Sequence, residues 1–125
     1  MITTNDLFLA GKAVSVVAKD EAMYRASINR LYYACYHKSY EYHVQLPQPG
    51  TVGQANGKHN QLINQLSYPS SGLTLRSKAE SIAMGKLLRV ICAQRVDSDY
   101  YLNKDVSEHD MKLALGTAES IFSNT

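Results

Sequence analysis

The stretch from Glu21 to Gln45 contains neither glycine nor proline, and this feature constrains the fold of the chain most strongly. Apolar side chains recur along it at spacings of three and four residues, and Asp20 stands directly before it as a candidate N-cap. Such uninterrupted periodicity predicts one long amphipathic helix. On a helical wheel, the residues that should face the core are Tyr24, Ile28, Leu31, Cys35, Ser39 and Tyr42.

A second face of the same predicted helix carries Ala26, Arg30, Tyr33, Ala34, His37, Glu41 and Val44. Arg30 and His37 project from one side of the helix, two turns apart. An arginine can hold a phosphate and a histidine can exchange a proton near neutral pH, so this pair is a candidate catalytic site. The alternative is structural, with Arg30 paired to Glu41 or to a neighbouring helix and His37 satisfied at an interface. Small and aromatic residues on this face suit burial against another chain, so we expect a homodimer through it.

The rest of the chain also has helical periodicity. Thr4 or Asn5 should cap a first helix, whose apolar residues are Leu7, Phe8, Ala10, Val14, Val17 and Ala18. Residues 46–57 collect prolines and glycines and should form a loop. A short third helix is predicted over 58–66, with Leu62, Ile63 and Leu66 facing inward.

Residues 68–72 should end that short helix, and a fourth helix is predicted from about residue 73 to about residue 101. Its predicted buried stripe is Ala79, Ile82, Ala83, Leu87, Val90 and Ile91. Ser107 and Asp110 form a capping signal for a last helix. We therefore expect an all-α fold, an up-and-down bundle of four or five helices, in a single domain over residues 1–125.

Charge, cysteine content and histidine spacing give expectations about partners, location and metal binding. The formal net charge of +2 is too small to indicate nucleic-acid binding, although it does not exclude it. Cys35 and Cys92 lie far apart without metal-type spacing, which predicts buried free thiols, a reducing compartment and a cytoplasmic location. Neither a signal peptide nor a membrane span is expected. A metal site is not expected either, because His37 and His43 would point in different directions from one helix.

The chain has nine tyrosines, and Tyr24, Tyr32, Tyr33, Tyr36, Tyr40 and Tyr42 lie in the second predicted helix. Clustered tyrosines can stack nucleic-acid bases. At helical spacing on both sides of a core helix, they are more often core and subunit-interface residues.

Three segments resemble the HEPN domain family of small helical bundles. The first is RASINRLYYACYH, from Arg25 to His37, which is similar to the family's opening signature. The second is Lys58-His59, similar to its central histidine segment, and the third runs from Arg95 to Asp99-Tyr100, similar to its late Arg-x-x-x-Asp-Tyr element.

This resemblance implies a homodimeric bundle that acts on RNA or binds nucleotides. Many family members are ribonuclease toxins or phage-defence effectors that a partner nucleotidyltransferase antitoxin neutralises, and their RNA cleavage needs no metal or other cofactor. Carried over, His37 would be the general acid/base and Arg30 the phosphate ligand, with Tyr33, His59 and Arg95 as candidate substrate-binding residues. The alternative function is a non-catalytic HEPN module that binds a nucleotide, RNA or a partner nucleotidyltransferase, because tyrosine stands where the family's late histidine would fall, after Arg95.

Overall fold

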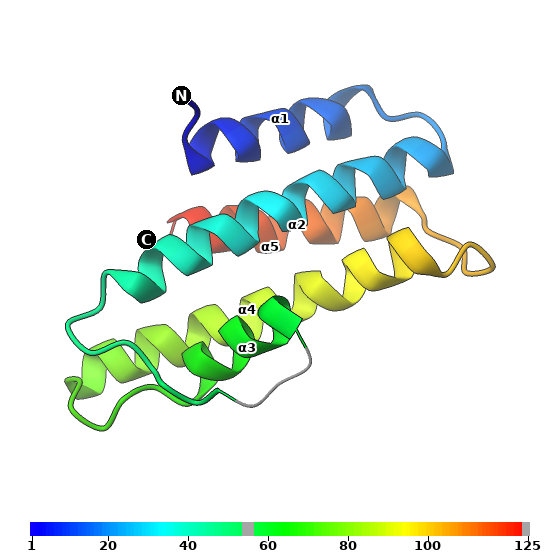
Figure 1. Ribbon diagram of the computed structural model, residues 1–125. Coiled ribbons are helices and arrows are strands. Elements are labelled where there is room, and N and C mark those ends of the chain that lie inside the picture. Colours follow the sequence, from blue (N-terminus) through cyan, green and yellow to red (C-terminus); the bar gives the residue numbers. More distant parts are fainter. Residues whose placement is uncertain (54–56, 124–125) are drawn as a thin grey trace.

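The computed structural model describes residues 1–53 and 57–123, and these form five helices. They are α1 (Thr4–Val17), α2 (Glu21–Val44), α3 (Gly57–Ser67), α4 (Leu75–Tyr100) and α5 (Glu108–Ser123). The four long helices α1, α2, α4 and α5 alternate in direction, and the short α3 lies beside α4 at one end of the bundle (Figure 1). The described residues contain no strand, so the predicted all-α bundle is confirmed.

The helix starts follow local capping chemistry. The residue that caps α1 is Thr3, rather than Thr4 or Asn5. Asp6 is the third residue of the helix, and its carboxylate accepts a hydrogen bond from the Thr3 amide at 2.9 Å. Asp20 caps α2 as predicted, accepting from the Met23 amide at 2.9 Å. Ser107 and Asp110 also cap α5 as predicted, with the Asp110 carboxylate accepting from the Ser107 amide at 2.9 Å.

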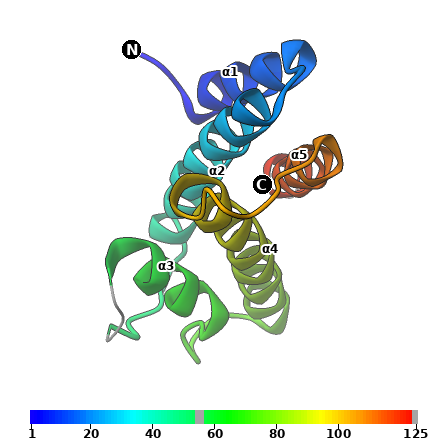
Figure 2. The ribbon, with the colours of Figure 1, turned by 90° about the vertical axis from the view of Figure 1, so that its right-hand side faces the viewer.

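Helix α2 is the centre of the molecule and contacts all four other helices (Figure 2). The predicted core face is confirmed at Ile28, Leu31, Cys35 and Ser39, which are buried. One assignment to the outer face is wrong, since Ala34 is fully buried. A helix with neighbours on so many sides buries a wider arc than the single stripe that an amphipathic surface helix shows.

The predicted buried stripe of α4 is largely wrong. Ala79, Ile82, Ala83 and Val90 are exposed, and of that stripe only Ile91 is fully buried. The buried residues of α4 are instead Ser81, Met84, Gly85, Leu88, Ile91 and Ser98.

Small residues on that inner face let α3 approach α4 closely. Ser81 Oγ donates to the Leu66 carbonyl at 2.8 Å. A Cβ on Gly85 would lie 2.9 Å from Ser67 Oγ and 3.2 Å from Leu66 Cβ. The inner face of α4 therefore carries small residues as well as apolar ones, because side-chain size limits how closely α3 can approach.

The connection between α2 and α3 is anchored by a buried histidine. His43 Nε2 accepts from the Gly50 amide at 2.9 Å, and burial lowers the pKa of His43. Residues 46–53 of the predicted loop are outside any helix, whereas positions 54–56 lie outside the described residues. Both cysteines are free, and Cys35 is buried as predicted while Cys92 is only half-buried. Among the described residues, no helix has the length and apolar character needed to cross a membrane.

Candidate functional site

A cluster of aromatic and imidazole rings forms between α2 and α3. The His37 ring lies edge-on to the Tyr33 ring at 4.4 Å and to the Tyr36 ring at 5.4 Å between centroids. The Tyr36 ring also contacts the His59 ring of α3, at 4.6 Å. Two histidines that are distant in the sequence therefore share one tyrosine as a neighbour.

Beside this cluster lies a pocket of about 500 Å³, which we call the α2–α3 pocket. Helix α2 contributes the His37 imidazole to its wall, and α3 contributes the exposed ammonium group of Lys58. The other lining residues are Tyr36, Tyr40, Gln61, Leu62 and Gln65. A cation, a proton-transfer group and two aromatic rings are thus gathered around one opening, which suits a ligand with a phosphate and a planar base.

His59 is fixed by a hydrogen bond from the first turn of α3 to the middle of α2. Its Nδ1 lies 2.6 Å from the buried hydroxyl of Tyr32. Burial raises the pKa of Tyr32, and Cys92 raises it further, so the hydroxyl stays protonated. Burial lowers the pKa of His59, and the positive charges of Arg95 and His37 lower it further, so the imidazole is neutral at neutral pH.

Arg95, from α4, contacts the Tyr32 side of this cluster. Its Nε pairs with Asp99 at 2.9 Å, and Asn29 Nδ2 donates to the same carboxylate oxygen at 2.8 Å. The guanidinium lies over the rings of Tyr32 and Tyr100, at 5.5 and 5.3 Å from their centroids. Arg95 is therefore held by structural partners, and its charge acts on the neighbouring His59 rather than at the wall of the α2–α3 pocket.

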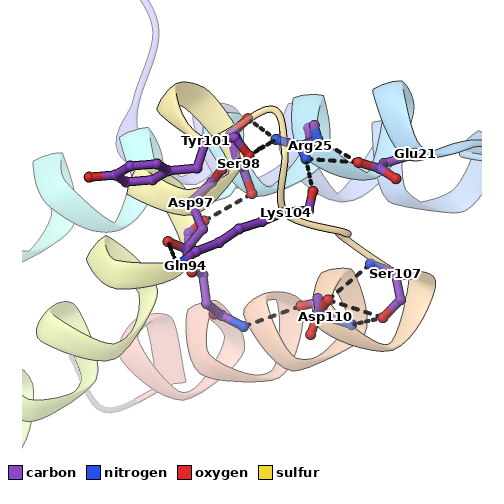
Figure 3. A network of polar contacts seen from close by, with 9 residues as sticks. All are labelled: Glu21, Arg25, Gln94, Asp97, Ser98, Tyr101, Lys104, Ser107 and Asp110. Atoms are coloured by element: carbon purple, nitrogen blue, oxygen red, sulfur yellow. Dashed lines mark hydrogen bonds and ion pairs between the residues drawn. The ribbon is translucent and has the colours of Figure 1, made fainter.

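Arg25, which opens the HEPN-like motif, has a structural role at the end of α4 (Figure 3). Its side chain donates to the carbonyls of Asp97, Ser98, Tyr101 and Lys104 and pairs with Glu21 at 2.8 Å. The carbonyls of Asp97 and Ser98 belong to the last turn of α4, and those of Tyr101 and Lys104 follow it, so one guanidinium with several donors binds backbone on both sides of the helix end. Arg25 thus joins α2 to the turn that follows α4.

The residues singled out from the sequence lie in two groups. Tyr33 and His37 meet on one side of α2, with Tyr33 about half exposed. His59 and Arg95 meet around Tyr32. Arg30 is exposed on the outer surface of α2 and lines neither group, and the suggested Arg30–Glu41 pair is absent because Glu41 lies 3.5 Å from Lys38.

Sequence reasoning did not single out Tyr32 or Asn29. Tyr32 lies one helical turn before Tyr36, a spacing that places both on the side of α2 that faces α3. Its pairing with His59 spans 27 positions, and no local pattern encodes such a contact. Within the described residues, no group of three His, Cys, Asp or Glu side chains is arranged to hold a metal ion.

Comparisons of the chain with protein-family models, curated proteins and solved structures find no match. The resemblance to HEPN domains therefore rests on the three motif segments and stays a prediction.

Proposed function

We propose that this protein binds RNA through a backbone phosphate in the α2–α3 pocket and cleaves it without a metal ion. The observation that carries the proposal is the presence of His37 and Lys58 on the wall of one pocket. An imidazole can give or take a proton during RNA cleavage, and an ammonium group can stabilise the negative charge of the phosphate. The motif resemblance supports the same chemistry.

The roles of the residues follow from their positions. Lys58 contacts the phosphate, His37 transfers a proton, and the rings of Tyr36 and Tyr40 offer faces on which a base can stack. Arg30, exposed on α2 two turns before His37, contacts a phosphate further along the strand. The expected products are a 2′,3′-cyclic phosphate and a 5′-hydroxyl.

A homodimer and a nucleotidyltransferase antitoxin complete the proposal. The exposed side chains of Arg30 and Tyr33 form part of the face expected to pair with a second copy, whereas Ala34 takes no part because it is buried within its own chain. The two free cysteines suit the reducing cytoplasm in which such toxins act. Sedimentation at micromolar concentration tests the dimer, and a purely monomeric species contradicts it.

The test of the proposed activity uses a fluorescent single-stranded oligoribonucleotide in the presence of EDTA. We expect cleavage by the wild type, and a loss of about 10²–10⁴-fold in His37→Gln. Arg30→Lys should lose less activity than His37→Gln, since lysine keeps the charge that contacts the more distant phosphate and lacks only the planar fork of donors. His109→Gln, an exposed histidine on α5, is the matched control and should cleave normally.

Binding is measured separately with the same strand carrying 2′-deoxyribose, which cannot be cleaved. Lys58→Ala should weaken this binding, and Lys112→Ala, which removes an ion pair on α5, should not. A wild type that binds the strand but never cleaves it would contradict the nuclease. That result would favour the non-catalytic RNA- or nucleotide-binding module, for which the two tyrosine faces in the pocket are the supporting observation.

A further inference from the structure

His59 has no role in the proposed reaction so far, although it lies next to Lys58 and against the Tyr36 ring that lines the α2–α3 pocket. Its other neighbours are the Tyr32 hydroxyl, at 2.6 Å from Nδ1, and the guanidinium of Arg95. The His59 ring is therefore held by contacts with Tyr32 and Tyr36. A histidine held by fixed neighbours, next in sequence to one pocket residue and in contact with another, is pre-organised for a specific task.

We propose that His59 is the second proton-transfer residue of the RNA site and that Tyr32 positions it, so that a single chain holds a complete acid–base pair. The inference rests on the proposed function and names a residue that the Arg30/His37 pairing does not include. It also predicts that a dimer carries two complete sites rather than one site assembled from two halves.

Tyr32 fixes which nitrogen of His59 can react. Its hydroxyl occupies Nδ1, which leaves Nε2 as the ring nitrogen available to a substrate. The Tyr32 side chain cannot readily turn away, because it is 2% exposed and Arg95 packs over its ring. The proposed role requires the tautomer in which Nδ1–H donates to Tyr32 Oη, because Nε2 then carries a lone pair and can act as a base.

The groups that face His59 favour its neutral form. Arg95 from α4 and His37 from α2 both contribute positive charge, and the Tyr32 and Tyr36 hydroxyls are uncharged near neutral pH because burial raises both pKa values. A neutral imidazole is the form that accepts a proton. His37, whose ring also contacts the Tyr36 ring, is then the acid of the pair.

The reaction balances with these two residues alone. His59 Nε2 takes the proton of the 2′-hydroxyl as the 2′-oxygen forms a bond to phosphorus. The bond from phosphorus to the 5′-oxygen breaks, and that oxygen keeps the electron pair and takes a proton from the His37 imidazolium. Proton exchange with water returns both histidines to their starting forms.

The experiment compares His59→Gln with the wild type and with His109→Gln, using the cleavable RNA strand and its 2′-deoxy analogue. We expect cleavage by His59→Gln to fall by about 10²-fold or more while binding of the analogue is retained. Normal cleavage by His59→Gln overturns the inference and leaves the proposed function standing. Absence of cleavage by the wild type overturns both.

Tyr32→Phe provides a second variant that keeps the ring and removes only the hydroxyl. We expect a lower kcat with little change in KM, and an acidic limb of the pH–rate profile that moves to lower pH because His59 loses its hydrogen-bond acceptor. A purely structural role for Tyr32 would leave that limb in place, and such a result counts against positioning.

Mixing the two inactive variants tests whether the pair belongs to one chain. An equimolar mixture of His37→Gln and His59→Gln chains, refolded together, should remain inactive, because every pocket then lacks one histidine. Recovery of activity would show that the pair is assembled across two chains and would overturn the single-chain site.

Discussion

Arg25 Nη1 donates to the carbonyl of Ser98 at 2.9 Å, although the two residues are 73 positions apart. This contact joins the second turn of α2 to the last turn of α4. It belongs to a network in which one guanidinium donates to carbonyls of the last turn of α4 and of the segment that follows it (Figure 3). The planar guanidinium, with its several donors, lets a single side chain reach all of these carbonyls, which a lysine ammonium group would not match.

Arg25→Ala should therefore destabilise the protein by about 1.5–3 kcal/mol, because it removes the charged donor from two carbonyls of α4 and two carbonyls of the segment after it. Urea denaturation measures the difference. Arg76→Ala is the matched control, since the Arg76 side chain is 90% exposed and pairs only with Glu80 one turn away. Its effect should stay within about 0.5 kcal/mol, and an equal loss in both variants would contradict the network.

Two helical glycines should respond to alanine in opposite ways. Gly116→Ala should stabilise the fold by about 0.5–1 kcal/mol, since no atom lies within 4 Å of the added Cβ and alanine favours a helix. Gly85→Ala places its Cβ 2.9 Å from Ser67 Oγ and should push α3 away from α4, with a net loss of stability. Thermal denaturation midpoints that rise in both variants would show that the α3–α4 contact is loose.

Stability should fall as the pH falls from about 7.5 to about 5.5. His43 and His59 have lowered pKa values in the folded protein, so the unfolded chain binds more protons than the folded chain in this range. The contribution of both histidines is present above their unfolded pKa and is lost as the pH falls through their folded values. His43→Gln and His59→Gln should each flatten the curve of unfolding free energy against pH, whereas the exposed His109→Gln should not.

Leu31→Ala should cost about 2–5 kcal/mol, because Leu31 is completely buried at the centre of α2 and contacts the Gly11 turn of α1. Lys38→Ala on the same helix should cost less than about 1 kcal/mol, since it removes only a 3.5 Å pair with Glu41 and a contact over the Phe122 ring. Chemical denaturation midpoints compare the two, and equal values would contradict the assignment of the α2 faces.

Periodicity in the sequence was sufficient to predict the helices and most of the core face of α2, because long apolar side chains mark that face. It was misleading for α4, where Ser81 and Gly85 face inward and Ile82 and Val90 face outward. Hydrophobicity is a poor guide wherever two helices approach closely enough to require small residues. The candidate site was also predictable only in part. Tyr33 and His37 are neighbours on one helix, so helical spacing predicts their contact. The Tyr32–His59 hydrogen bond depends on how α3 packs against α2, which no local pattern encodes.

Helix α3 contacts only α2 and α4 among the described helices, although its Leu62, Ile63 and Leu66 belong to the same buried core as residues of the four long helices. The side chains of Lys58 and Gln61, from this same helix, line the α2–α3 pocket. Lys58 is exposed and Gln61 is only partly buried, so substitutions at these two pocket positions should have little effect on global stability. A library randomised at the pocket-facing positions of α3, with Leu62 and Leu66 kept, should yield many folded variants that differ in what they bind.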